Sequence, residues 1–337
     1  MFRYMGKGET QGLVTASSSI EDGASQGKRR NSSSKAGPTP FHRRQSYLPV
    51  DSKSKSRWLI YDNDGSFNGW FDWLPIEYRV GYWSPFVVLS IICFYTALFA
   101  LKPELDFPAT VLDNKLRLAR GSAVFGMPRA TAADLGVFLW GILVMVQAKL
   151  SLGSMGAFPI SFTGWSWLLL TFRAGFEFSA WAVEAQGHVQ LATHLAKIGS
   201  SIRLAAISNA AVVCLVWNLI LLPIVLLKAI PKGEKRDGFL KFNFGFFMTN
   251  VHVLNLPLAS IHTVIGSNTR LFTHADLWVS YLVLLLYSAL YFFGLDRLGL
   301  HFYPIFNPRT SWSVLSILLV LGLYYKMFNT WNDFITA

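Results

Sequence analysis

Apolar residues gather into seven long runs, which shorter polar stretches separate. Most of these runs approach the roughly 20 residues that a helix needs to cross a bilayer. Tryptophan and tyrosine residues stand near several of the run ends, as they do at membrane interfaces. The pattern therefore predicts an all-α, polytopic transmembrane helix bundle of seven spans, or of six if the first run does not cross. The predicted spans are 84–101, 134–152, 164–185, 204–228, 243–263, 276–295 and 311–330.

Three segments of different composition follow one another along the chain. Residues 1–57 are rich in Ser, Gly, Lys and Arg and hold few apolar clusters, which predicts a disordered tail. Residues 58–83 are rich in aromatic residues and are expected to lie at the membrane surface. Residues 84–337 form the predicted transmembrane domain. Cys93 and Cys214 both fall inside apolar runs, so neither a disulfide framework nor a metal site is expected from them.

Most of the positive charge belongs to the tail. Residues 1–57 hold 11 basic and 4 acidic residues and so supply +7 of the formal net charge of +11. An anionic lipid surface, and not nucleic acid, is the expected partner of such a segment beside a membrane domain. Ser32 and Ser46 each follow an arginine pair and are candidate phosphorylation sites. Phosphate there would cancel nearby charge and weaken the attraction to lipid.

The third run carries unusual polar residues. Within two helical turns it places Thr171, Arg173 and Glu177 among aromatic and aliphatic residues. Ionised groups in hydrocarbon are costly and usually face a protein interior or a wet cavity. Arg173 and Glu177 lie four residues apart on one helix face, so they can neutralise each other. Thr171 lies about 160° around the helix from Arg173 and faces elsewhere.

A second polar stripe lies in the run that contains His252, Asn255 and Pro257. Three-residue spacing brings His252 and Asn255 to one face of a helix. Pro257 is expected to loosen the local hydrogen-bond ladder. A neutral, buried histidine can act as a general base, with an amide such as Asn255 orienting its second nitrogen. A hydroxyl paired with such a base would become a nucleophile.

Three short motifs together resemble the androgen-induced and androgen-dependent TFPI-regulating family of membrane proteins. The segment Gly164-Trp-Ser-Trp-Leu-Leu-Leu-Thr171-Phe is similar to the family's threonine motif. His252 stands in a His-x-x-x-Leu-Pro pattern similar to that around the family's histidine. The segment Leu300-His-Phe-Tyr-Pro-Ile-Phe306 resembles the family's aromatic segment before the last span. The resemblance covers about 135–330, and the basic tail and residues 58–133 depart from it.

The resemblance implies an enzymatic function. The family consists of polytopic hydrolases that use an intramembrane threonine and a histidine on fatty acid esters of hydroxy fatty acids. Carried over, Thr171 becomes the nucleophile, His252 the base, and a membrane lipid ester the substrate, with no cofactor or metal. Asn255 is a candidate for orienting His252. Arg173 and Glu177 are candidate supporting residues, either closing the polar end of the pocket or pairing structurally.

Two other classes of protein remain open at this point. One is a non-enzymatic membrane protein, either a receptor or a lipid-binding scaffold, in which Thr171 and His252 only pack. The other is a seven-span zinc-dependent lipid hydrolase, which requires three histidines such as His188, His252 and His262 to converge. The expected location is an endomembrane, such as the endoplasmic reticulum, or the plasma membrane.

Overall fold

The computed structural model describes residues 83–105, 127–152, 158–229, 233–266, 270–296 and 303–336. All of them belong to the larger of two compact units, Trp70–Ala337. The predictions for the tail 1–57, with Ser32 and Ser46, lie outside the described residues, as does nearly all of the aromatic segment 58–83.

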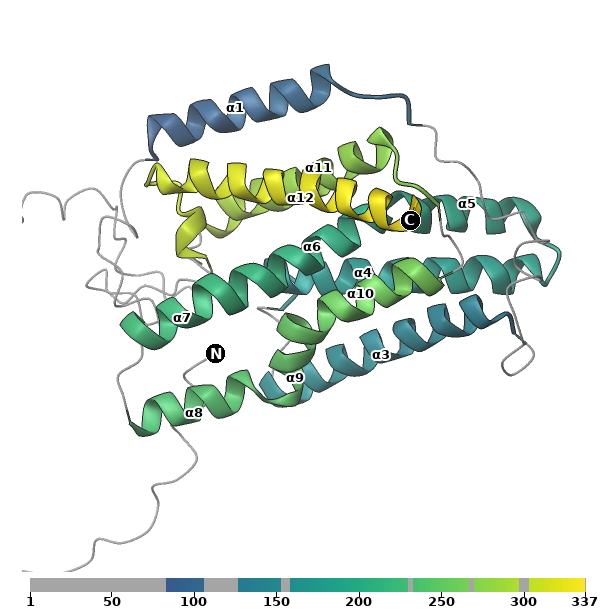
Figure 1. Ribbon diagram of the computed structural model, residues 1–337, viewed down its shortest axis with the longest axis horizontal. Coiled ribbons are helices and arrows are strands. Elements are labelled where there is room, and N and C mark those ends of the chain that lie inside the picture. The colour runs from purple at the N-terminus through teal and green to yellow at the C-terminus, as the bar shows by residue number, and fades with distance from the viewer. Residues whose placement is uncertain are drawn as a thin grey trace, which may run out of the picture. The chain divides into compact units, whose positions relative to one another are not determined.

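Every regular element in these ranges is a helix, which confirms the all-α prediction (Figure 1). A helix occupies each of the seven predicted apolar runs. The longer elements are α1 (Pro85–Ala100), α3 (Arg129–Leu152), α4 (Phe162–Glu184), α5 (Val189–Ser201), α6 (Arg203–Leu215), α8 (Glu234–Asn243), α10 (Asn255–Ile265), α11 (His274–Ala289) and α12 (Trp312–Thr336). Shorter ones are η6 (Val216–Leu221), α7 (Leu222–Ile224), η7 (Val225–Ala229), α9 (Phe246–Thr249), η8 (Asn250–Leu254), η9 (Leu290–Leu295) and η10 (Pro304–Phe306).

The number of spans is lower than the predicted six or seven. Within the described residues, four helices are long and apolar enough to cross a membrane. A fifth is obtained if the two helices Arg236–Asn243 and Phe246–Ile265, bent by 58°, form one span. The four are Arg129–Leu150, Val189–Leu227, His274–Leu295 and Trp312–Thr336. These helices make the chain an integral membrane protein.

The two predicted spans that fall short do so for different reasons. Helix α1 has 16 residues, about 24 Å at 1.5 Å per residue, whereas the hydrocarbon core is about 30 Å thick. Helix α4 is long enough but carries Arg173 and Glu177 in its middle and Glu184 at its end. It packs against α3, α5, α6 and α10, so protein surrounds much of this helix in place of lipid. The sequence pattern could not distinguish an apolar run that faces lipid from one enclosed by other helices.

Helix α6 lies between the α11–α12 pair and the group formed by α4 and α10 (Figure 1). Eleven consecutive residues, Arg203 to Val213, are buried on every side of the helix. Many of them are Ala or Ser, and such small side chains let neighbouring backbones approach closely in membrane bundles. Helices α4 and α6 therefore form the centre of the described bundle, and the other helices surround them.

The helix that contains His252 is distorted beside its proline. Residues Asn250–Leu254 form a π-helical turn that leads into α10, where Pro257 occupies the third position. Proline lacks a backbone N–H and cannot complete the α-helical ladder one turn before it, so the turn widens. The predicted loosening is confirmed, and it falls on the residues around His252.

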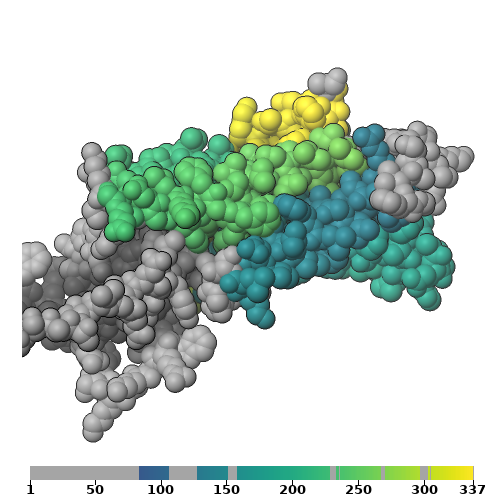
Figure 2. Space-filling view, turned by 90° about the horizontal axis from the view of Figure 1, so that it is seen from below, coloured from purple at the N-terminus to yellow at the C-terminus, as the bar shows by residue number. Residues whose placement is uncertain are grey.

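Apolar side chains cover the outer face of the bundle. Figure 2 shows α3 side by side with the α9–α10 helix on one face. Leu139, Leu143 and Val146 of α3 are exposed there, as are Ile261 and Val264 of α10. Exposed apolar surface of this extent is typical of contact with lipid, because a soluble monomer rarely carries it.

Replacing Gly141 of α3 by alanine is expected to destabilise the bundle. A Cβ atom there would lie 2.2 Å from Thr171 Oγ1 and 2.7 Å from its Cγ2, and the β-branched threonine has few rotamers with which to retreat. We expect the free energy of unfolding to fall by about 1–3 kcal/mol, the usual cost of overpacking. Gly136→Ala is the matched control, because a Cβ atom at that position would have no other atom within 4 Å. Thermal unfolding in detergent measures both variants, and equal stability would contradict the α3–α4 packing.

Candidate active site

Three segments that are distant in sequence meet around the first turns of α4. Ser161 caps this helix, its Oγ accepting a hydrogen bond from Gly164 N at 3.0 Å. The hydroxyl of Tyr303, from the segment before α12, lies 3.5 Å from Thr163 Oγ1 and accepts from Thr163 N at 3.4 Å. Asn255 Nδ2, from the start of α10, donates to Ser166 Oγ at 2.9 Å. The parts of the chain that carry the three sequence motifs are thus neighbours in space.

His252 is buried in the π-helical turn, where 6% of its surface is exposed. Its imidazole stacks on the indole of Trp217, with ring centroids 4.2 Å apart and an angle of 20° between the planes. Trp217 is itself held by a hydrogen bond from its Nε1 to Asn243 Oδ1 at 3.0 Å. Asn218 Nδ2 donates to the carbonyl oxygen of His252 at 2.9 Å. His252 Nδ1 is buried and has no hydrogen-bond partner among the described residues.

Asn255 contacts the hydroxyl of Ser166 and not the imidazole of His252. Its side-chain oxygen Oδ1 is buried and has no partner in the described part of the chain. The proposed orienting role of Asn255 on His252 therefore stays a prediction. Instead, Asn255 holds the Ser166 hydroxyl of α4 through a hydrogen bond, and Asn255 is three residues from His252 in the sequence.

Thr171 faces α3. It is buried, its Oγ1 donates to the carbonyl oxygen of Trp167 at 2.8 Å, and its side chain lies over Gly141. Trp167 Nε1 donates to the carbonyl oxygen of Gly141 at 3.1 Å, which is a second link between α4 and α3. The local geometry therefore places this hydroxyl at the α3–α4 interface.

The register of α4 against α10 separates Thr171 from His252. Asn255 pairs with Ser166, and His262 with Arg173, each 89 positions apart, so the two helices run in the same direction. On this register His252 is level with Thr163. Thr171 lies about eight residues further along, or about 12 Å at 1.5 Å per residue. No hydrogen bond joins Thr171 and His252 among the described residues, and their joint catalytic role stays a prediction.

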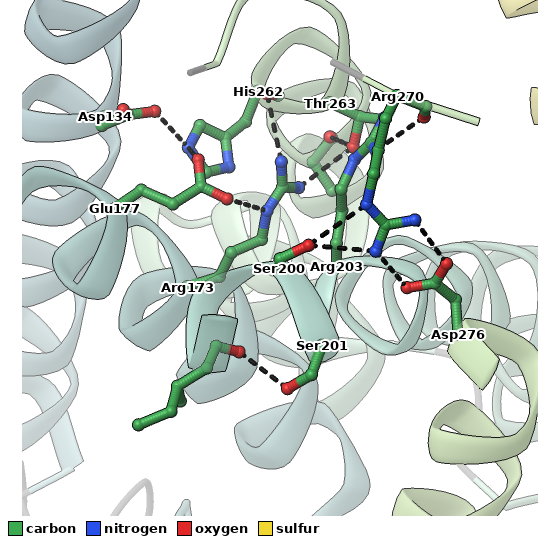
Figure 3. A network of polar contacts seen from close by, with 12 residues as sticks. Asp134, Arg173, Glu177, Ser200, Ser201, Arg203, His262, Thr263, Arg270 and Asp276 are labelled. Carbon is green, nitrogen blue, oxygen red and sulfur yellow. Dashed lines mark hydrogen bonds and ion pairs between the residues drawn. The ribbon is translucent and has the colours of Figure 1, made fainter. Parts of the chain in front are cut away.

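Arg173 and Glu177 form the expected ion pair, with Nε 3.2 Å from Oε1 and both side chains buried. Figure 3 shows that this pair belongs to a larger network of polar contacts. Arg173 also donates from Nη1 to Thr263 Oγ1 at 3.1 Å and from Nη2 to the carbonyl oxygen of His262 at 3.4 Å. His262 Nε2 lies 2.8 Å from Asp134 Oδ1 of α3. The ion pair therefore ties α4 to α10, and His262 ties α10 to α3.

A second part of the network lies beside the first (Figure 3). Arg270 forms a bidentate ion pair with Asp276, both bonds being 2.7 Å, and also donates to Ser200 Oγ. Arg203 Nη1 donates to the carbonyl oxygen of Arg270 at 2.7 Å, and its guanidinium lies 4.4 Å from the ring centroid of Phe272.

Sequence reasoning did not select Asp134, Arg203, Arg270 or Asp276 as site residues. The available signal was the presence of ionisable residues in or beside apolar runs, which usually marks an interior position. That signal identifies the residues one at a time, and their partners lie on other helices.

The histidines in the described part of the chain do not form the three-histidine zinc site. His188 and His194 are exposed at the start of α5, whereas His252 and His262 are buried. The two buried histidines are ten residues apart in one helix, about 15 Å along its axis. The one group in the described residues with metal-ligand spacing is Asp134, Glu177 and His262. The zinc hydrolase as formulated from the sequence therefore lacks its ligand set.

Comparisons with known proteins found no matching family model, no matching curated protein and no matching solved structure. The fold defines the class of the protein as an all-α integral membrane protein with buried polar clusters.

Proposed function

We propose that this protein is an intramembrane hydrolase of lipid esters. The observation that supports this function best is the meeting of the three motif segments around the first turns of α4, through Thr163, Ser166, Asn255 and Tyr303. Fatty acid esters of hydroxy fatty acids are the substrates that the motif resemblance suggests. His252, stacked on Trp217 and with an unpartnered nitrogen among the described residues, is the proposed general base.

Two hydroxyls of α4 are candidates for the nucleophile. Thr171 is the residue that the motif designates. Ser166 is the residue that the register favours, because its partner Asn255 lies three residues from His252. In either case His252 takes the hydroxyl proton while the oxygen attacks the ester carbonyl, and the departing alcohol then receives that proton. Water next hydrolyses the acyl-enzyme and regenerates the hydroxyl.

A small apolar crevice lies near the segment that carries Tyr303. It lies between α1 and the α11–α12 pair, with Phe94, Leu284 and Phe292 in its lining. Phe306 also lines it, and the Phe306 ring contacts that of Tyr303 at a centroid distance of 6.3 Å.

The proposed setting is an endomembrane such as the endoplasmic reticulum, or the plasma membrane. Membrane lipid is the proposed substrate, and the basic tail 1–57 is proposed to associate with anionic lipid.

An alkyl fluorophosphonate tests the proposal, because it phosphonylates activated hydroxyls. We expect wild-type membranes to hydrolyse members of a lipid-ester panel and the probe to abolish that activity. Mapping the labelled peptide by mass spectrometry then assigns the nucleophile, since a label on Thr171 and a label on Ser166 are distinguishable. The His252→Ala variant is the control and should remain unlabelled. An unlabelled, inactive wild type would favour the non-enzymatic receptor or scaffold.

A further inference from the structure

Three potential metal ligands from three helices meet at the end of the bundle away from Ser166. Asp134 lies in the second turn of α3, Glu177 in the second half of α4, and His262 in the last turn of α10. All three side chains are buried, with at most 2% of their surface exposed. Figure 3 shows them pointing toward one another. Their ligand atoms all lie within 4.8 Å of one another.

The spacing of these atoms fits a small cation. His262 Nε2 lies 2.8 Å from Asp134 Oδ1 and 3.8 Å from Glu177 Oε2. Around a tetrahedral zinc ion, bonds of about 2.0–2.2 Å put neighbouring ligand atoms about 3.4 Å apart. The two observed distances lie within about 0.6 Å of that value, and the ligand atoms of Asp134 and Glu177 are no more than 4.8 Å apart, so binding requires the side chains to shift.

One ligand atom is incompletely bound without a cation. Glu177 Oε1 accepts from Arg173, but Glu177 Oε2 is buried and has no hydrogen-bond partner among the described residues. A buried carboxylate oxygen without a hydrogen-bond partner is unfavourable, and more so when the group is charged. This oxygen is the one that faces His262 Nε2. It is therefore oriented as a metal ligand would be.

Two carboxylates and the guanidinium groups of Arg173 and Arg203 surround the imidazole of His262. Asp134 and Glu177 bring two carboxylates to one imidazole, and the Arg173 guanidinium pairs with the Oε1 atom of Glu177. The Arg270 charge is matched separately by Asp276. A bound cation would lie between Asp134 Oδ1 and Glu177 Oε2 and contact both carboxylates.

We propose that Asp134, Glu177 and His262 bind one first-row divalent cation, with zinc as the cation best suited to an imidazole and two carboxylates. Arg173 holds Glu177 in place through its other oxygen. Gly266 allows the chain to turn directly beside the site, because a Cβ there would lie 2.4 Å from the carbonyl oxygen of His262. This site is separate from His252 and does not depend on the proposed hydrolase.

Metal analysis of the purified full-length chain tests the site. The protein is incubated with ZnCl2, freed of excess metal by gel filtration, and analysed by inductively coupled plasma mass spectrometry. We expect about one zinc per wild-type chain and at least tenfold less in Asp134→Asn and Glu177→Gln. These variants keep the shape of the side chain and remove its charge. His252→Ala should retain the zinc, and so should the double variant His188→Ala/His194→Ala, which lacks the two exposed histidines at the start of α5.

A wild-type chain that takes up no zinc overturns the proposal. Equal zinc content in the wild type, Asp134→Asn and Glu177→Gln overturns it as well. If both site variants fail to fold, the wild type and the His188→Ala/His194→Ala variant decide. Zinc should then raise the unfolding temperature of both proteins by the same amount, because binding to the folded state alone stabilises it. The absence of a shift in the double variant would identify the exposed histidines as the binding site.

Discussion

Replacing His252 by alanine is expected to lower lipid-ester hydrolysis by about two to four orders of magnitude, the usual contribution of a general base. The proposed nucleophile needs a partner to take its proton, and His252 is the buried histidine nearest to Ser166 and Asn255 along the helix. Thr171→Ala should lose activity to the same degree if Thr171 is the nucleophile. The double variant should then lose no more than either single one, because the two residues act as a unit.

Hydrolysis by membranes at matched expression measures this prediction. His274→Ala is the control, since this histidine is exposed at the start of α11 and lies outside the three motifs. Wild-type activity in His252→Ala would remove His252 from the mechanism. If Thr171→Ala remains active and Ser166→Ala does not, the register between α4 and α10 identifies the nucleophile better than the motif does.

Replacing Arg173 by methionine is expected to lower the free energy of unfolding by about 3–5 kcal/mol, the range for breaking a buried ion pair from one side. Glu177 would be left buried without its cation, and the carbonyl oxygen of His262 would lose the donor that links α10 to α4. The double variant Arg173→Met/Glu177→Leu removes both charges. It should therefore lose less stability than Arg173→Met alone.

Unfolding in detergent micelles, followed by circular dichroism, measures both effects. Arg129→Met provides the matched control, because Arg129 is exposed at the start of α3 and its loss should change stability by less than about 0.5 kcal/mol. A loss below about 1 kcal/mol in Arg173→Met would contradict the central position assigned to the ion pair.

The local sequence pattern was sufficient to predict which segments form helices. Each long apolar run became a helix, since a segment without water must satisfy its own backbone hydrogen bonds. The Arg173–Glu177 pair was predictable because four-residue spacing is a property of one helix. The distortion next to Pro257 was predictable because the missing N–H is local as well. These features depend on residues within about one or two helical turns.

The tertiary structure decided whether lipid or protein covers each helix and which distant residues are in contact. The pattern overestimated the spans because apolarity does not reveal whether lipid or protein covers a helix, as in α4. The pattern did not predict the contact between Asp134 and His262, which are 128 positions apart on different helices. The motif resemblance paired Thr171 with His252, which stays a prediction, and the packing of α10 on α4 sets Asn255 against Ser166 and His262 against Arg173. Helix register is set by side chains that interlock across an interface, and the sequence of one helix does not contain that information.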